Sequence, residues 1–320
     1  MILLLTTRAS SHTDLVTARL NAMGAEYLRF DTDTVPAQAR MHASFTDGRL
    51  DGWLTDGTRR VSFPEIRAIW WHAVGVAEIS AKTDVLFRDW VQGELASAIA
   101  TIACALPAAR FPDPDRVAAA GRKWKQLAVA TRCGFRCPAS LITSSANELT
   151  RFSQGRPTVF KTLSHPEVRV AGEPSRQVYT TLLSTKDIER AHLLEHSIGF
   201  FQEYVSKVRD VRVTVVGDRV FAVAIESQES QLASVDWRRY DLANTPHHVI
   251  ELDEATKHKC RRVLRCLELE YGAFDFAEDA NGRLWFLEVN PNGLWAWLEI
   301  LTGVPISEAI AEHLVGLAAG

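Results

Sequence analysis

Polar residues interrupt an apolar segment near the end of the chain, FLEVNPNGLWAWLE at residues 286–299. Glu288, Asn290 and Glu299 lie there among phenylalanine, leucine, valine and tryptophan side chains, which favour a protein core. A polar group that is buried without a partner costs about 1–3 kcal/mol. The segment therefore predicts that a bound cation or ligand satisfies these polar groups.

A hairpin over residues 273–290 would bring a second carboxylate to Glu288. If the Asn-Gly pair at 281–282 forms a two-residue type I′ turn, Asp275 lies opposite Glu288. Period-two alternation then places Asn290 on the same face as Glu288. Facing carboxylates repel each other, and a hard cation such as Mg²⁺ removes this repulsion and also binds substrate phosphates. The spacing favours a magnesium site at these three residues, and a solvated face with scattered acids is the alternative.

Two lysines upstream could neutralise the phosphates that such a magnesium ion binds. Lys161 is the one charge inside the apolar segment TVFKTL (158–163), and Lys123 lies in GRKWKQLAVA (121–130). A lysine in a strand or a helix is often exposed to solvent, so an ordinary surface role is the alternative for each.

A linker and a strand start complete the set of polar candidates. The segment FFQEYV (200–205) is an apolar strand that stops at a Gln-Glu pair, an edge that could pair with an adenine base. Asp210 and Arg212 begin the next strand on one face. Asp210 could accept hydrogen bonds from ribose hydroxyls, and Arg212 could clamp a phosphate or a carboxylate through two hydrogen bonds. A surface salt bridge is the alternative for each of these two residues. The prediction therefore rests on the order in which all the candidate residues follow one another in the chain.

The elements that must position these residues follow an α/β order. Strands at 2–6 and 26–31 flank a helix at about 14–23, and this β-α-β start favours a parallel, doubly wound sheet. Two Asp-Gly dipeptides then mark hairpin turns, and a helix is predicted over 84–106. The proline-rich segment RFPDPDR (110–116) is the predicted domain boundary.

Strands become frequent in the second half of the chain. Helices are predicted over 116–133 and 253–269, and a Gly-Asp turn divides DVRVTVVGDRVFAVAIES (210–227) into a hairpin. Residues 164–176 are polar and contain two prolines, which predicts an exposed loop.

Composition excludes several classes of protein. The chain has 320 residues, of which 47% are hydrophobic and 23% charged, as in a globular protein of two or three domains. A net charge of −3 gives no reason to expect nucleic-acid binding, and no apolar run approaches the roughly 20 residues of a membrane span. The five cysteines form no CxxC pair, which predicts reduced thiols and a cytoplasmic protein.

The ordered motifs resemble the ATP-grasp superfamily over about residues 112–320. Lys123 follows a hinge, Lys161 lies in a strand, a QEYV linker precedes DVRVTVVGD, and Asp275 precedes Glu288-x-Asn290. The closer resemblance is to the graspetide macrocyclases, the microviridin-type maturases of ribosomal peptides. It is carried by FQEYV.K..DVRVTVVGD, by SVDWR (234–238), and by FLEVNPNGLWAWLE followed by TGVPI.

The resemblance implies a role for each matched residue. The ATP-binding set comprises Lys123, Lys161, Gln202, Glu203, Tyr204, Val205 and Asp210. The magnesium-binding set comprises Asp275, Glu288 and Asn290. The catalytic set comprises Lys161, Arg212 and Arg238. The two lysines would contact phosphates, the 202–205 linker adenine, and Asp210 ribose, whereas the two arginines would steady the transferred phosphoryl group or the substrate carboxylate. No general base is evident.

The resemblance also implies a fold and a division into domains. The expected fold is an α/β ATP-grasp fold, in which two α+β lobes sandwich ATP, preceded by an N-terminal parallel-sheet α/β domain. The expected domains are the N-terminal domain at 1–112, a central lobe at 113–196 and a C-terminal lobe at 197–320.

The function implied by the resemblance is ATP-dependent macrocyclisation of a ribosomal precursor peptide, which belongs to RiPP biosynthesis. Asp or Glu side chains of the peptide would be activated as acyl phosphates and linked to Ser or Thr hydroxyls or Lys amines. The implied partners are ATP, Mg²⁺, the leader and core of the precursor, and a second copy of the chain in a homodimer. An ATP-grasp ligase that adds an amino acid, or a non-catalytic nucleotide- or peptide-binding protein, is the alternative.

One departure concerns the loop after the second lysine. Many ATP-grasp enzymes cover the phosphates there with a glycine-rich loop, whereas residues 164–176 contain only Gly172, alongside His165, Glu167 and Arg169. Graspetide enzymes look similar in this respect.

Overall fold

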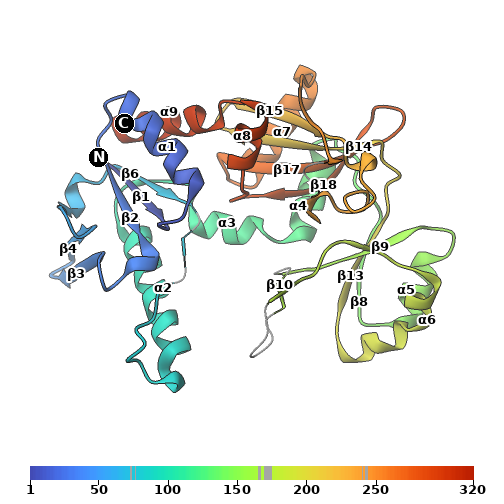
Figure 1. Cartoon of the computed structure of the whole chain (residues 1–320), viewed down its shortest axis with the longest axis horizontal. Coiled ribbons are helices and arrows are strands. Elements are labelled where there is room, and N and C mark those ends of the chain that lie inside the picture. The colour runs from blue at the N-terminus through green and yellow to red at the C-terminus, as the bar shows by residue number, and fades with distance from the viewer. Residues whose placement is uncertain (73, 76, 165–166, 169–174, 240, 242–243) are drawn as a thin grey trace.

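A computed structural model describes the chain except for residues 73, 76, 165–166, 169–174, 240 and 242–243. The described strands build three lobes (Figure 1). We name them by their main sheets: the N-terminal lobe (β2-β1-β6-β7), the middle lobe (β12-β9-β13-β8) and the C-terminal lobe (β16-β15-β14-β17-β18). The first sheet is parallel and the other two are antiparallel, which confirms the predicted α/β class.

The N-terminal lobe begins with the predicted β-α-β unit. β1 (Ile2–Thr6) and β2 (Tyr27–Asp31) are parallel and flank α1 (Ser11–Ala22). β6 (Ala68–Trp71) and β7 (Ala109–Phe111) extend the sheet on the other side of β1. Every residue of β1 is buried, as expected for a central parallel strand that is covered on both faces.

Two further elements extend from this lobe. β3 (Arg40–Thr46), β4 (Arg49–Thr55) and β5 (Arg60–Ser62) form an antiparallel sheet. Both residues of the Asp-Gly turn between β3 and β4 have positive φ, as a type I′ turn requires. α2 (Arg88–Ala105) projects away from the rest of the molecule (Figure 1).

The predicted helix over 116–133 is two helices. α3 (Pro114–Ala120) and α4 (Lys123–Arg132) are separated at Arg122, whose backbone is extended. The break places Lys123 at the first position of α4. Apolar residues of both helices join the core on one face of the C-terminal sheet.

The middle lobe is small. Its elements are β8 (Ser140–Thr143), α5 (Ala146–Ser153), β9 (Thr158–Lys161), β10 (Glu167–Val168), β11 (Arg176–Gln177), β12 (Thr181–Leu182), α6 (Thr185–Glu189) and β13 (Gly199–Glu203). β13 lies between β8 and β9 and pairs with both. The predicted domain boundary at residue 197 therefore separates β13 from β8 and β9, the strands with which it pairs.

The C-terminal lobe carries the strand-rich part of the chain. Its elements are β14 (Arg209–Val216), β15 (Arg219–Ile225), β16 (His247–Ile250), α7 (Glu254–Cys266), β17 (Tyr271–Glu278) and β18 (Leu284–Asn290). Side chains alternate along these strands. On the face that we call the back face, Val211, Val213, Phe274, Phe276 and Phe286 join a core with α4 and α7. The opposite, front face carries five of the predicted site residues, namely Asp210, Arg212, Asp275, Glu288 and Asn290.

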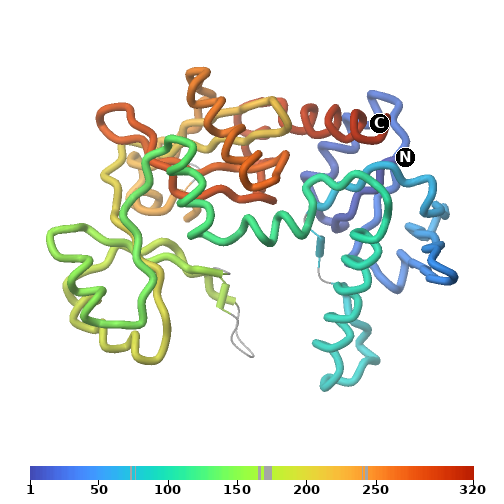
Figure 2. The backbone as a smooth tube through the Cα atoms, turned by 180° about the vertical axis from the view of Figure 1, so that it is seen from behind, coloured from blue at the N-terminus to red at the C-terminus, as the bar shows by residue number. Residues whose placement is uncertain are grey.

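The last helices pack the C-terminal lobe onto the N-terminal lobe. α8 (Ala296–Thr302) and α9 (Ile306–Ala319) share one core cluster with β1, α1 and three strands of the C-terminal sheet. α9 lies beside α1 from both sides of the molecule (Figures 1 and 2). The first and last segments of the chain therefore form a continuous apolar interface.

Candidate active site

Asp275 and Glu288 face each other across β17 and β18, as predicted from the sequence. Asn290 lies on the same face, and its Nδ2 donates to Asp275 Oδ2 at 3.1 Å. The two acids are 6% and 8% exposed. The structure thus brings together the three residues that were predicted to bind magnesium.

The turn of this hairpin differs from the prediction. Glu278 pairs with Leu284, so the loop spans residues 279–283. Gly282 has positive φ, whereas Asn281 does not. A type I′ turn requires positive φ at both central residues, so the predicted two-residue turn is wrong.

A β-bulge restores the predicted pairing. Phe276 pairs with Phe286 and Asp275 with Glu288, which leaves Leu287 as the extra residue of β18. Without a bulge, Phe286 and Glu288 would lie on the same face of the strand. The bulge allows Phe286 to enter the back-face core while Glu288 lies on the front face.

Glu288 contacts two cations that lie far from it in the sequence. Lys123 Nζ is 2.5 Å from Oε2, and Arg238 Nη1 is 3.1 Å from Oε1. Burial alone would raise the pKa of Glu288, but the charges of Lys123, Arg238 and Lys161 outweigh burial and hold this pKa far below its usual range. Glu288 is therefore an anion at neutral pH.

Asp275 is paired within the sheet. Arg212 lies opposite it on β14, and Nη1 donates to Oδ1 at 2.9 Å. Burial raises the pKa of Asp275, and the charge of Arg212 opposes this while that of Glu288 adds to it. Burial thus disfavours the anionic form of Asp275 beside the anion Glu288. A divalent cation suits such a pair, because it stabilises both negative charges.

Two residues that the sequence analysis did not assign hold Arg238. The oxygens of Asp236 accept from Nε and Nη2 at 2.9 and 3.0 Å, in a bidentate pair. Thr180 donates its backbone N–H to Asp236 Oδ2 at 2.9 Å, and its hydroxyl lies 3.3 Å from Arg238 Nη2. Burial opposes the ionisation of Asp236, yet hydrogen bonds from Arg238 hold its pKa below the ordinary value. Asp236 is part of the SVDWR motif, so this motif could have indicated Asp236 as a site residue.

Lys161 reaches the site from β9. Its Nζ donates to Gln202 Oε1 at 2.8 Å, and Gln202 Nε2 donates to Ser140 Oγ at 3.0 Å. Burial lowers the pKa of Lys161 to about 8. No described carboxylate lies within ion-pair distance of this ammonium, which leaves it available to an anionic ligand.

The predicted adenine hinge connects the middle and C-terminal lobes. Glu203 ends β13 and Tyr204 follows it, and their backbone N–H groups donate to Ala139 O and Pro157 O, each at 2.8 Å. Val205 follows in the segment that leads to β14. The hinge backbone is therefore fixed to the middle lobe as far as Tyr204.

Asp210 is buried at the start of β14 and already has protein partners. Lys207 Nζ lies 2.9 and 2.7 Å from its two oxygens, and the Ser227 hydroxyl donates to Oδ2 at 2.5 Å. Burial raises the pKa of Asp210, and Lys207 opposes the rise. Lys207 belongs to the FQEYV.K..D motif, but the sequence analysis gave it no role.

A cavity of about 430 Å³ lies next to these charges. Charged, amide and indole groups line it, among them Arg212, Trp237, Arg238, Asp275, Asn290, Asn292 and Trp297. The rings of Trp237 and Trp297 are 5.1 Å apart, and the Arg212 guanidinium lies 5.9 Å from the Trp237 ring centre. The cavity therefore combines a charged end with an aromatic wall.

The oxygen donors of the site fit magnesium. Among the described residues, no group of three or more His, Cys, Asp or Glu could hold a metal ion. Asp275, Glu288 and Asn290 instead supply two carboxylates and one amide oxygen, because Asn290 forms its hydrogen bond through Nδ2. Mg²⁺ characteristically takes few protein ligands and completes its shell with water and phosphate oxygens.

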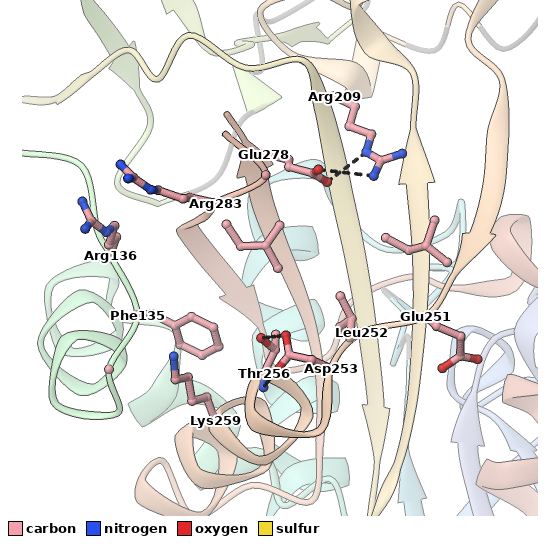
Figure 3. Close-up of a pocket in the computed structure, with 14 residues that line it drawn as sticks. Phe135, Arg136, Arg209, Glu251, Leu252, Asp253, Thr256, Lys259, Glu278 and Arg283 are labelled. Carbon is pink, nitrogen blue, oxygen red and sulfur yellow. Dashed lines mark hydrogen bonds and ion pairs between the residues drawn. The ribbon is translucent and has the colours of Figure 1, made fainter. Parts of the chain in front are cut away.

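Another pocket, of about 360 Å³, lies away from this cluster (Figure 3). Phe135, Arg136 and Arg283 line it, and Arg209 and Glu278 form an ion pair at 2.9 Å there. It contains none of the predicted site residues. We therefore place the candidate active site at the front face of the sheet.

The loop expected to cover the phosphates is only partly described. Glu167 lies in β10, whereas His165, Arg169 and Gly172 lie outside the described residues. The role of this loop stays a prediction.

Comparisons with known proteins agree with this geometry. The family model of the MvdD pre-ATP grasp domain matches residues 1–116. A RiPP-associated ATP-grasp ligase of Chryseobacterium gregarium, solved with ADP and a leader and core peptide, is 26% identical with a TM-score of 0.91, and the match covers 98% of this chain and 96% of that one. No curated protein matches the sequence.

Two macrocyclases from Microcystis aeruginosa are also similar. MdnC, solved with its precursor peptide MdnA, is 28% identical with a TM-score of 0.88, and 99% of each chain is covered. MdnB is 27% identical with a TM-score of 0.80, and 98% of each chain is covered. Residues 1–116 therefore match an MvdD pre-ATP grasp domain, and the chain has the fold of these ATP-grasp enzymes over nearly its whole length.

Proposed function

We propose that this chain is an ATP-dependent macrocyclase of a ribosomal precursor peptide. The observation that carries the proposal is the front-face cluster of Glu288 with Lys123 and Arg238, in a fold shared over nearly its whole length with a RiPP-associated ligase. That ligase was solved with ADP and a leader and core peptide, and MdnC with a precursor peptide. ATP, Mg²⁺ and a precursor peptide are the ligands that we assign to this chain.

The reaction has two steps. A side-chain carboxylate of the peptide attacks the γ-phosphorus of ATP, and ADP leaves, which gives an acyl phosphate. A Ser or Thr hydroxyl or a Lys amine then attacks the acyl carbon, and inorganic phosphate leaves with the activating oxygen. Each crosslink thus removes the elements of one water from the peptide. The protein contributes mainly positioning and charge stabilisation.

The cations of the cluster suit this task. We assign Lys123 and Lys161 to the phosphates, and Arg212 and Arg238 to the transferred phosphoryl group or the peptide carboxylate. In the structure, Lys123 and Arg238 contact Glu288. A bound phosphate would take over these cations.

The acids of the cluster complete the assignment. Asp275, Glu288 and Asn290 would hold Mg²⁺, which when bound supplies positive charge against the phosphate oxygens. Asp275 stays oriented by Arg212, because that pair lies within the sheet.

We assign the adenine contact to Gln202, Glu203, Tyr204 and Val205. We assign the ribose contact to Asp210, whose oxygens also contact Lys207 and Ser227. For the domains we retain residues 1–112, 113–196 and 197–320. β13 belongs to the third of these segments but pairs with β8 and β9 of the second.

A homodimer in the cytoplasm is the assembly that we propose. Large apolar side chains are 56–81% exposed in and just before the projecting helix α2, namely Val85, Leu86, Phe87 and Trp90. Such a patch suits a second copy of the chain. All five cysteines are free, in line with a reducing compartment. No helix in the described ranges has the length and apolar character needed to cross a membrane.

Mass spectrometry of a precursor peptide tests the function. The peptide encoded beside this gene is incubated with the protein, ATP and Mg²⁺. Loss of one water per crosslink, absent with Glu288→Gln and retained with the surface control Glu254→Gln, supports macrocyclisation. A gain equal to one amino-acid residue would instead indicate a ligase. An unchanged peptide without phosphate release would contradict both functions.

A further inference from the structure

A histidine of the N-terminal lobe contacts the turn that follows the predicted magnesium ligands. His72 comes directly after β6, and its Nδ1 lies 3.0 Å from Asn292 Oδ1. Asn292 belongs to the turn at residues 291–293, just beyond Asn290. This hydrogen bond joins residues 220 positions apart in the chain.

The tautomer of His72 follows from its partner. An amide oxygen only accepts hydrogen bonds, so Nδ1 of His72 carries the proton and donates. The ring is 2% exposed, and burial lowers the pKa of His72 to about 3, with the nearby His12 adding to the shift. His72 is therefore a neutral, fixed donor across the ordinary range of pH.

The ring of His72 is held in place from two sides. It stacks on Trp70 with ring centres 4.8 Å apart and an interplanar angle of 3°, and the ring of His12 lies 4.8 Å away. His12 in turn accepts the backbone N–H of Ala296 through Nδ1 at 3.3 Å. Two histidines of the N-terminal lobe thus contact the segment that runs from the end of β18 to the first residue of α8.

This segment is tightly packed against the site. Tyr271 donates its hydroxyl to Gly293 O at 2.6 Å, and Arg212 Nη2 donates to Leu294 O at 3.1 Å. A Cβ atom at Gly293 would approach Arg212 Nη2 to 2.9 Å and Asn290 Cβ to 2.9 Å. A displacement of the turn would therefore also move Asn290 and Arg212.

We infer that His72 is a positioning residue for the magnesium–nucleotide site. By holding Asn292, it fixes the turn from which Asn290 and Arg212 take their positions, so the N-terminal lobe takes part in binding the metal–nucleotide complex. The inference rests on the proposed function, because it presupposes that Asn290 is a ligand of Mg²⁺. A residue that only packs the lobes together would affect stability, without a specific effect on magnesium.

Binding of ADP with and without Mg²⁺ distinguishes these roles. The full-length chain is titrated with ADP by calorimetry at saturating Mg²⁺ and in EDTA. His72→Phe keeps an aromatic ring but removes the donor, and we expect ADP binding with Mg²⁺ to weaken about three- to tenfold, the effect of one lost hydrogen bond. Binding in EDTA should change less than about twofold, because Asn290 then has no metal to hold.

Two further variants complete the test. His72→Asn places an amide N–H near the position of Nδ1, so we expect it to restore ADP binding with Mg²⁺. Asn292→Ala removes the acceptor from the more exposed side of the bond, and in this background His72→Phe should cause no further loss. Asn292→Ala alone also tests the inference if His72→Phe does not fold.

Each other outcome overturns the inference. Equal weakening with Mg²⁺ and in EDTA, or a lowered Tm without weaker binding, would assign His72 a merely structural role. A wild-type chain whose ADP binding does not depend on Mg²⁺ would contradict the proposed function, and the inference with it. A Mg²⁺-dependent wild type that His72→Phe leaves unchanged would contradict the inference alone.

Discussion

The two faces of the C-terminal sheet are built from the same strands and differ in what they bury. On the back face, Val213, Phe274 and Phe276 pack with apolar residues of α4 and α7. On the front face, Arg212 and Asp275 are 4% and 6% exposed. Adjacent residues of one strand thus enter an apolar core and a charged cluster.

The difference shows how stability and function are divided within one sheet. The back face gains about 25 cal/mol for each Å² of apolar surface that it buries. The front face buries charges, which is costly unless each charge has partners, so it depends on ion pairs with residues such as Lys123 and Arg238. We therefore expect substitutions on the back face to change stability and those on the front face to change catalysis.

The largest effect is expected on the back face, at Phe276. Its ring contacts those of Phe135, Phe274 and Phe286 and is fully buried. Phe276→Ala should lower the free energy of unfolding by about 3–5 kcal/mol, measured by urea denaturation, because it leaves a cavity. Phe276→Leu, which retains most of the volume, should cost much less. Weaker ADP binding in a folded Phe276→Ala protein, without loss of stability, would refute the division of the two faces.

Glu288 should give the largest effect on catalysis. Glu288→Gln removes the negative charge that we assign to magnesium binding, so we expect kcat/KM for crosslinking to fall by about 10²–10³-fold, as when one preorganised electrostatic partner is lost. Its Tm should fall less than that of Phe276→Ala. A variant that crosslinks at the wild-type rate would exclude Glu288 from the reaction.

Asp236 tests whether the charged face needs its supporting residues. Asp236→Asn breaks the bidentate pair that orients Arg238, and we expect about a tenfold lower kcat/KM, the effect of losing a charge-assisted hydrogen bond. Asp218→Asn, in the exposed turn between β14 and β15, is the matched control and should have wild-type activity. Equal rates for both variants would contradict the role of Asp236.

Lys161 predicts a smaller, pH-dependent effect. Its pKa of about 8 means that the ammonium loses its proton as pH rises through 8, so ADP binding should weaken above that pH by up to about tenfold per unit. The unfolded chain binds more protons than the folded chain between pH 8 and 10.5, so this group makes stability rise over the same range. Lys161→Arg, which stays charged, should remove the decline in binding. A decline that persists in Lys161→Arg would assign it to another group.

The local arrangements could be predicted from the amino-acid sequence. Alternation along β17 and β18 placed Asp275, Glu288 and Asn290 on one face, and the β-α-β unit at the start followed from its apolar pattern. These features depend on residues close together in the chain, where strand period and turn residues limit the choices. The predicted type I′ turn was nevertheless wrong, because the extra residue of the bulge is invisible to a count that assumes a regular ladder.

The partners of these residues, in contrast, depend on the packing of distant parts of the chain. Lys123 reaches Glu288 across 165 positions, Thr180 reaches Arg238 across 58, and His72 reaches Asn292 across 220. Such contacts depend on how the lobes pack, and no local period encodes that packing. The role of Lys207 could not be predicted for a related reason, because a lysine in a linker is ordinarily exposed to solvent. In the structure Lys207 is buried and forms an ion pair with Asp210.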